Sequence, residues 1–381
     1  MMMKKISAVC MCAALLAGQF CPALAIEPVP PAVSSPSLLL MEKQTGRVLY
    51  EKDADTPRLP ASVTKVMTLL LVMEAIDKGT LRLDEKINIS ANAQNMGGSQ
   101  VYLAEGEQYA AEDLIKSVVI ASGNDAAVAL AEYLAGSEAT FVGRMNERAA
   151  QLGMSNTHFL DCTGLSDEGH LTSARDIATM SRELLKYPLI KKYTTVWMDS
   201  LRDGTFGLNN TNKLIRFYPG ATGLKTGSTS RAGFCLSATA ERAGMELIAV
   251  VMAAGTSAQR FEEAKLLLDF GFANYTIAEA APAEPLKNVP VLLGKAPEVP
   301  TALKQQEFVL VGKGEAKDLV SEVTLTEDVE APVEAGQVLG ELTVKSGDTL
   351  LITVPIVAAE SVARLSALDI FGQLVRRFFL S

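Results

Sequence analysis

The spacing of hydrophobic residues predicts a buried helix near the start of the chain. Residues 62–78 carry apolar side chains nearly all round a helix, and Gly79 follows as a C-terminal stop. A helix without a polar face is expected at the centre of a domain, where every side is covered. Upstream, short apolar runs at residues 38–42 and 47–51 flank Gln44-Thr45-Gly46, which predicts a β-hairpin.

The rest of the first 278 residues shows both helical and strand-like periods. Further helices are expected at residues 113–120, 125–135, 138–152, 174–187 and 258–269. Strands are expected at residues 225–226, 233–240 and 246–254, with a turn around Arg242-Ala243-Gly244 joining the last two. Residues 26–278 are thus predicted to form an α/β domain of the α+β kind, with an antiparallel sheet and a helical subdomain.

After residue 278 the composition shifts, and a second domain is expected. Residues 279–285 are alanine, proline and acidic residues without periodicity, which is typical of a linker. Short alternating runs follow at residues 307–311, 320–325, 340–344 and 350–354. Because Gly, Pro and Asp turns separate these runs, residues 279–360 are predicted to hold the linker and a small β-rich domain.

The C-terminal segment, residues 361–381, changes period once more and predicts an amphipathic helix. The apolar face would carry Leu365, Leu368, Phe371, Val375, Phe378 and Phe379. The opposite face would carry Ser366, Asp369, Gln373, Arg376 and Arg377. Such a helix could pack on the protein core, but aromatic and basic content at a chain end favours an anchor that lies on a membrane surface.

The N-terminal residues have the pattern of a secretory signal peptide. Lys4 and Lys5 precede an uncharged apolar stretch, and Ala23-Leu24-Ala25 ends it with a small-x-small cleavage pattern. An uncleaved anchor is the alternative, but the apolar stretch is shorter than the roughly 18 residues that a spanning helix needs. Residues 1–25 are therefore predicted to be removed, so that the exported chain begins at Ile26.

Composition narrows the classes of partner and cofactor. A formal net charge of −9 makes the chain acidic, so nucleic acid is not an expected partner. Beyond the signal segment only Cys162 and Cys235 remain, which could form one disulfide but are favoured as two buried small hydrophobes. With only His158 and His170 besides, there is no Cys/His cluster for a metal.

A serine and a lysine three residues apart form the first chemical motif, Ser62-Val63-Thr64-Lys65. This spacing places both side chains on one helix face. Serine is a weak nucleophile without a neighbouring base, and a lysine can be that base if it loses its proton near neutral pH. Burial and the second ammonium of Lys225 are expected to lower the pKa of Lys65, and the helix N-terminus favours a developing alkoxide. Ser62 is therefore the expected nucleophile and Lys65 the general base.

Two further motifs are Ser122-Gly123-Asn124, on a glycine loop between two helices, and Lys225-Thr226-Gly227-Ser228, in a strand. Each pattern has a second copy, at Ser90-Ala91-Asn92 and at Lys345-Ser346-Gly347. Context separates the copies: residues 90–92 are expected at a helix N-terminus, and residues 345–347 in an ordinary turn of the β-rich domain. The three chosen motifs together indicate an acyl-transfer enzyme.

The order of these motifs resembles that of D-alanyl-D-alanine carboxypeptidases, the low-molecular-mass penicillin-binding proteins of the peptidase S11 family. Residues 60–68, 122–126 and 170–176 are also similar to longer family signatures. The linker, β-rich domain and amphipathic tail match the family layout, so the resemblance covers nearly the whole chain. It implies a catalytic domain with the fold shared by DD-peptidases and β-lactamases.

The resemblance implies catalytic roles for four side chains. Ser62 would be acylated with Lys65 as base, and Ser122 would relay the proton to the leaving amine. Asn124 would hold the amide backbone of the substrate. Backbone N–H groups of Ser62 and Ser228 would form the oxyanion hole.

The resemblance also implies a carboxylate-binding strand. Lys225 and Thr226 would bind the terminal carboxylate of a D-Ala-D-Ala stem peptide, assisted by Arg260, and Gly227 and Ser228 continue the same strand. The implied partners are peptidoglycan stem peptides, β-lactam antibiotics as covalent inhibitors and a membrane surface, without any cofactor. The implied location is the outer face of the bacterial cytoplasmic membrane, in the periplasm or cell-wall space.

Two other functions stay open on the sequence. A serine β-lactamase shares the acylation step but must admit a water that hydrolyses the acyl-enzyme, and no convincing glutamate motif for that step is found. The middle triplet is also Ser-Gly-Asn and not the Ser-Asp-Asn of class A enzymes. A non-catalytic wall-binding protein would keep the fold, but the intact serine and lysine motifs argue against it. The carboxypeptidase is therefore the favoured function.

Overall fold

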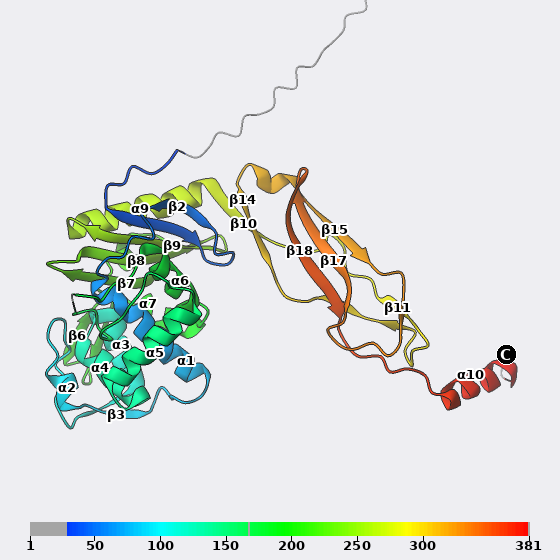
Figure 1. Cartoon of the computed structure of the whole chain (residues 1–381), viewed down its shortest axis with the longest axis horizontal. Helices are drawn as coiled ribbons and strands as arrows, with labels where there is room; N and C mark the ends of the chain where they lie inside the picture. Colours follow the sequence, from blue (N-terminus) through cyan, green and yellow to red (C-terminus); the bar gives the residue numbers. More distant parts are fainter. Residues whose placement is uncertain (1–28, 167, 380–381) are drawn as a thin grey trace, which may run out of the picture.

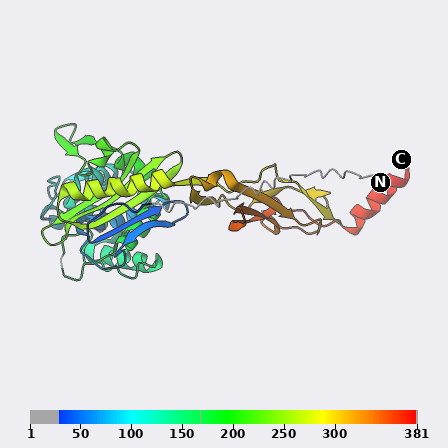
Figure 2. The same ribbon diagram turned by 90° about the horizontal axis from the view of Figure 1, so that it is seen from above.

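The computed structural model describes residues 29–166 and 168–379 and shows an elongated molecule with two domains (Figure 1). An α/β domain lies at one end, a β-rich domain follows, and helix α10 (Ala367–Phe379) lies at the far end, an arrangement that the second view keeps (Figure 2). The predicted signal peptide lies outside the described residues. The predicted fold class, an α+β domain followed by a small β domain and a terminal helix, is confirmed.

A five-stranded antiparallel sheet forms the centre of the N-terminal domain, in the order β2-β1-β9-β8-β7. Its strands are β1 (Ser37–Glu42), β2 (Val48–Lys52), β7 (Ala221–Thr229), β8 (Gly233–Arg242) and β9 (Met245–Ala254). Helix α9 (Ser257–Asn274) covers one face, and the helical subdomain covers the other (Figure 1). The predicted hairpin at residues 38–51 is confirmed as β1 and β2.

Strand β1 is buried on both faces, which explains its continuous apolar sequence. Leu38 and Leu40 pack into the core beneath α9. Leu39 and Met41 point the opposite way, into the core shared with the helical subdomain. Because side chains alternate across a strand, both sets must be apolar when both faces are covered. The sheet thus separates two hydrophobic cores.

Helix α1 (Lys65–Asp77) lies inside the helical subdomain, buried along nearly its whole length. Around it the chain forms α2 (Ala91–Gln94), α3 (Ala111–Lys116), α4 (Asn124–Ala135), α5 (Glu138–Gln151), α6 (Ala174–Leu184), α7 (Lys191–Thr194) and α8 (Leu214–Phe217). Two small antiparallel sheets of two strands each lie among these helices: β3 (Lys86–Asn88) with β4 (Gln108–Ala110), and β5 (Met198–Leu201) with β6 (Phe206–Asn209). The sequence-predicted central helix is therefore confirmed.

Side-chain caps fix several helix starts. Ser173 accepts a hydrogen bond from Asp176 N and begins α6, and Ser90 accepts one from Ala93 N and begins α2. Each cap satisfies a backbone donor that lacks an intrahelical partner. Ser90 thus has the helix-terminal position that was predicted for the second copy of the Ser-x-Asn pattern.

The C-terminal domain consists of β-strands with two small cores, and its strand pairs are antiparallel except for β11 with β16, which is parallel. A four-stranded sheet joins β13 (Thr301–Leu303), β18 (Thr349–Ala358), β17 (Val338–Ser346) and β15 (Leu319–Leu325). A three-stranded sheet joins β12 (Glu298–Val299), β11 (Val289–Leu292) and β16 (Val329–Glu330). Lys345-Ser346-Gly347 lies at the turn between β17 and β18, as predicted.

The two domains are joined by a paired strand. Strand β10 (Tyr275–Glu279) continues from α9 and pairs with β14 (Phe308–Gly312) of the second domain. Leu310 of β14 packs into the core beneath α9, and Arg47 donates a hydrogen bond to the Leu310 carbonyl. The boundary proposed near residue 278 falls inside β10, so an ordered strand spans it.

Helix α10 exposes apolar side chains. Leu368 is 82% exposed and Phe371 is 66% exposed. Of the described side chains on this face, neither Leu368 nor Phe371 belongs to a hydrophobic core, although the sequence pattern allowed such packing. Among the described residues, we find no helix with both the length and the apolar character that crossing a membrane requires.

Candidate active site

Residues from three distant segments meet beside the N-terminal end of α1. Lys65 Nζ lies 3.0 Å from Ser62 Oγ and 2.5 Å from Asn124 Oδ1. Lys225 Nζ donates to Ser122 Oγ at 2.8 Å. The structure therefore brings together the three motifs that the sequence singled out.

Ser62 lies on a 3-10 turn, η1 (Ala61–Thr64), and α1 begins only at Lys65. The helix was expected to start at Ser62. The difference arises because Ala61 has a φ of +48°, so the chain enters the turn from a left-handed conformation and not from a helical one. Within residues 61–70 every residue except Ser62 is buried, so its hydroxyl is reachable while its neighbours are packed.

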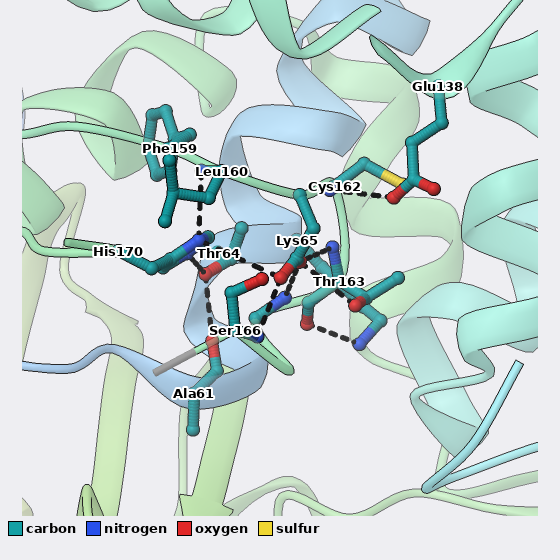
Figure 3. Close-up of polar contacts among 12 residues, drawn as sticks. Ala61, Thr64, Lys65, Glu138, Phe159, Leu160, Cys162, Thr163, Ser166 and His170 are labelled. Carbon is teal, nitrogen blue, oxygen red and sulfur yellow. Dashed lines mark hydrogen bonds and ion pairs between the residues drawn. The ribbon is translucent and has the colours of Figure 1, made fainter. Parts of the chain in front are cut away.

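Three oxygen atoms surround the Lys65 amine, and their chemistry orients it. Besides Ser62 Oγ and Asn124 Oδ1, the Thr163 carbonyl accepts from Nζ at 2.8 Å (Figure 3). Asn124 Nδ2 donates to the Gly97 carbonyl, which fixes Oδ1 as the atom that faces Lys65. A neutral amine has two N–H donors and one lone pair. Because the amide and carbonyl oxygens can only accept, the lone pair of a neutral Lys65 must face the Ser62 hydroxyl.

Burial makes that neutral form more accessible. Burial lowers the pKa of Lys65 from 10.5 to about 8, although the charge of Asp161 opposes the shift. Repulsion between the two lysines, which was expected to act on Lys65, instead lowers the pKa of Lys225. Lys65 can therefore lose its proton near neutral pH, as a general base must.

Ser122 lies on a strained turn between two helices. A π-helical turn, η2 (Ser117–Ala121), ends at Ser122, which has a φ of +64°, and α4 starts at Asn124. The adjacent carboxylate of Asp125 accepts from the backbone N–H groups of Val101 and Leu103 and ties this turn to the preceding loop. Strained residues of this kind persist only where surrounding contacts hold them, and they cluster at functional sites.

Lys225 and Thr226 lie on β7, one of the two edge strands of the central sheet. Burial first, and then the charges of Lys65 and Arg260, hold the pKa of Lys225 well below its ordinary value. Lys225 Nζ donates to Ser122 Oγ and to the Thr226 carbonyl. The Thr226 hydroxyl donates to Thr211 Oγ1 at 2.7 Å.

Gly227 allows β7 to approach the nucleophile closely. A Cβ atom at this position would lie 2.7 Å from the Pro60 carbonyl oxygen and 2.8 Å from Ser62 N. Arg260, on α9, donates to the Gly227 carbonyl at 2.9 Å and to the Cys235 carbonyl at 3.2 Å. Arg260 thus supports the strand through two backbone carbonyl groups, and the residue is buried. Ser228, the next residue, is exposed.

Sequence reasoning missed three contributors. Thr163 acts through its backbone carbonyl, which no residue type signals. Thr211 contacts Thr226 from a turn that shows no chemical motif. Asp125 directly follows the Ser-Gly-Asn triplet, and an acidic residue in the first turn of a helix could have been read as a brace for that loop.

The two cysteines are free and buried, so the disulfide alternative does not occur. Cys162 Sγ lies 3.3 Å from Glu138 Oε1, and Cys235 Sγ contacts the carbonyls of Leu59 and Ala232. Both behave as the small buried residues that were predicted. His170 is buried behind α1, whereas the side chain of His158 is exposed.

Comparisons with known proteins extend over nearly the whole chain. Residues 25–256 match the sequence model of a family described as D-alanyl-D-alanine carboxypeptidase, and residues 279–364 match that of the penicillin-binding protein 5 C-terminal domain. The D-alanyl-D-alanine carboxypeptidase DacF of Bacillus subtilis is 42% identical over 336 residues, which are 86% of each chain.

One solved structure matches most of the chain, and a second matches a shorter part of it. Penicillin-binding protein 5 from Haemophilus influenzae has a TM-score of 0.76 at 29% identity and covers 88% of this chain and 99% of its own. Penicillin-binding protein D2 from Listeria monocytogenes, solved in an ampicillin-bound form, has a TM-score of 0.59 at 32% identity. That comparison covers 64% of this chain and 100% of the other.

Proposed function

The chain belongs to the D-alanyl-D-alanine carboxypeptidase family of serine-type peptidases, and we propose that it removes the terminal D-alanine of peptidoglycan stem pentapeptides through an acyl-enzyme on Ser62. One observation carries the assignment of the nucleophile. Lys65 Nζ lies 3.0 Å from Ser62 Oγ, and its other two partners are oxygen atoms that can only accept hydrogen bonds. The lone pair of a neutral Lys65 amine can therefore accept a proton only from the Ser62 hydroxyl.

In the acylation step Ser62 Oγ attacks the carbonyl carbon of the penultimate D-alanine while Lys65 takes the hydroxyl proton. Lys65 returns this proton through Ser122 to the nitrogen of the leaving amine, and the C–N bond breaks, so that terminal D-alanine departs as the ester forms. The close approach of Gly227 to Ser62 N supports an oxyanion hole at this point. Ser228 is the next residue of β7, so its N–H group and that of Ser62 are the proposed donors to the oxyanion. Water then hydrolyses the ester and restores Ser62.

The substrate carboxylate is proposed to bind Lys225 and Thr226. Lys225 is buried near two other cationic side chains, which explains the lowered pKa of its amine. A bound carboxylate favours the charged form and would raise that pKa again. Asn124 already bonds Lys65 and Gly97 through both amide atoms, which supports a role in orienting the base beside the proposed contact with substrate.

Release of D-alanine from diacetyl-Lys-D-Ala-D-Ala by the purified protein is the direct test. We expect steady release that stops in proportion to the fraction of protein acylated by penicillin, because both compounds compete for one serine. Peptide mapping should place the penicilloyl adduct on Ser62. Rapid turnover of penicillin would support a β-lactamase instead, and a folded protein that neither labels nor releases D-alanine would indicate a wall-binding role.

We further propose that the mature chain is exported and is held at the outer face of the cytoplasmic membrane by α10. The signal-peptide pattern of residues 1–25 supports export. Exposed Leu368 and Phe371 support an interfacial position for α10, since such a helix buries its apolar face in the headgroup region.

Removal of α10 should release the protein from lipid. In co-sedimentation with anionic vesicles, we expect the chain beginning at Ile26 to bind and the same chain ending at Ser366 to stay in solution. Phe371→Ser should weaken vesicle binding by about tenfold, because the helix loses one aromatic side chain that would insert into the lipid. Equal sedimentation of the full and shortened chains would refute the anchor, and both should retain carboxypeptidase activity toward the soluble peptide.

A further inference from the structure

His170 is buried behind the nucleophile turn and has a complete set of partners. The backbone N–H of Leu160 donates to Nδ1 at 3.1 Å, and Nε2 lies 2.8 Å from Thr64 Oγ1 (Figure 3). The ring also packs edge-on against Phe159, at 5.7 Å between centroids. No proton transfer of the proposed reaction uses this histidine.

These contacts determine where the ring carries its proton. Nδ1 accepts the Leu160 N–H and must therefore be unprotonated. Nε2 carries the hydrogen and donates it to Thr64 Oγ1. The Thr64 hydroxyl, whose acceptor position is thus used, donates in turn to the Ala61 carbonyl at 2.8 Å. A directed chain of hydrogen bonds runs from Leu160 through His170 and Thr64 to Ala61.

The end of this chain is the peptide unit of the nucleophile. The Ala61 carbonyl and the Ser62 N–H belong to one planar peptide, so fixing the oxygen also fixes the direction of the N–H. That N–H is the proposed oxyanion donor. Ala61 needs such support, because it is a non-glycine residue with a φ of +48°. Lys65 follows Thr64 directly and is tied to the same turn.

We propose that His170 is a positioning residue for acylation, which acts through Thr64 to hold the Ala61–Ser62 peptide with its oxyanion donor and nucleophile in register. The inference rests on the proposed function, because it assigns His170 to that reaction. Its loss should lower the rate of the covalent step and leave the noncovalent affinity for the inhibitor or substrate nearly unchanged, since the described side-chain hydrogen bonds of Lys225 and Thr226 do not involve His170 or Thr64.

Two isosteric replacements separate this role from simple support of the loop. Asparagine places an amide oxygen near the position of Nδ1, so His170→Asn keeps the acceptor for Leu160 and loses the donor to Thr64. Glutamine places an amide nitrogen near Nε2, so His170→Gln keeps the donor to Thr64 and loses the acceptor for Leu160. Each variant loses one of two ring hydrogen bonds, and similar losses of thermal stability are expected.

Stopped-flow measurement of acylation by a fluorescent penicillin should distinguish the variant that keeps the donor to Thr64 from the variant that loses it. For His170→Asn we expect the limiting acylation rate constant to fall about 100-fold, as when an oxyanion donor is displaced, with a nearly unchanged dissociation constant. His170→Gln should stay close to the wild type. Thr64→Val and Thr64→Ser form a second matched pair, in which only valine removes the hydroxyl. His158→Asn, at the exposed histidine, is the surface control.

The outcomes separate the two levels of the proposal. Equal acylation rates in His170→Asn and His170→Gln would overturn the positioning role, and so would a wild-type acylation rate in Thr64→Val. Acylation of the wild-type protein would still support the proposed function in either case. A wild-type protein that penicillin does not acylate would overturn the proposed function and this inference with it. Slow acylation of the asparagine and valine variants, together with near-normal acylation of the glutamine and serine variants, would support the positioning role of His170 through Thr64.

Discussion

Methionine in place of Lys65 is expected to slow the acylation of Ser62 by about 1,000-fold or more, because the serine loses the base that contacts its hydroxyl. The wild-type rate should rise with pH up to about 8, where the amine loses its proton, and then level off. Below that pH the ammonium cannot accept the serine proton. The Lys65→Met rate should lack this rise.

Stability should move differently from activity in that variant. Lys65 is fully buried, and burial disfavours its charge, so an apolar side chain of similar length removes a desolvation cost. Two oxygen acceptors, on Asn124 and Thr163, lose a donor and offset part of that gain. Thermal unfolding should therefore show a melting temperature no lower than that of the wild type. A Lys65→Met protein that penicillin acylates within tenfold of the wild-type rate would exclude Lys65 as the base.

Alanine at Gly164 is expected to destabilise the catalytic domain by about 3 kcal/mol or more and to abolish acylation of the remaining folded protein. Its Cβ would lie 1.9 Å from the Ala61 carbonyl oxygen and 2.3 Å from the Ala61 carbonyl carbon, both backbone atoms. Gly164 also has a φ of +86°, which an alanine adopts only with strain. The clash pushes directly on the peptide that precedes Ser62.

Gly169 provides a matched control in the same segment. Its φ is +81°, but an added Cβ would meet only Leu160 Cδ1, at 3.5 Å. Gly169→Ala should therefore cost only the conformational strain, about 1 to 2 kcal/mol, and should keep normal acylation. Urea unfolding and penicillin labelling of both variants make the comparison. Similar stability and labelling of the two alanine variants would show that the close approach at Gly164 is unimportant.

The sequence could predict the elements whose cause is local. The all-round apolar pattern of residues 62–78 indicated a central helix, and the Ser-Gly-Asn triplet between two helical runs indicated a loop. The spacing of Ser62 and Lys65 predicted their contact, because i and i+3 positions remain neighbours whether the turn is α-helical or 3-10.

The parts that could not be predicted depend on backbone atoms from distant segments. Thr163 contacts Lys65 through a carbonyl group, which every residue carries. The left-handed conformation of Ala61 has no signal in an alanine, and it is set by Thr64 and by the approach of Gly164. The sequence also could not show which of the two lysines has its pKa lowered by the charge of the other. Lys225 is the one affected, because it is buried near both Lys65 and Arg260.

Leu310 has a consequence for how this chain could be divided or recombined. The leucine belongs to the C-terminal domain in sequence, yet its side chain completes the core beneath α9, and its strand pairs with the end of the N-terminal domain. A catalytic fragment cut near residue 278 would leave part of that core open to water and an unpaired strand edge. In a chimaera that replaces the second domain, the new domain must therefore provide an apolar side chain at the position of Leu310. Without it, the exchange would destabilise the catalytic domain.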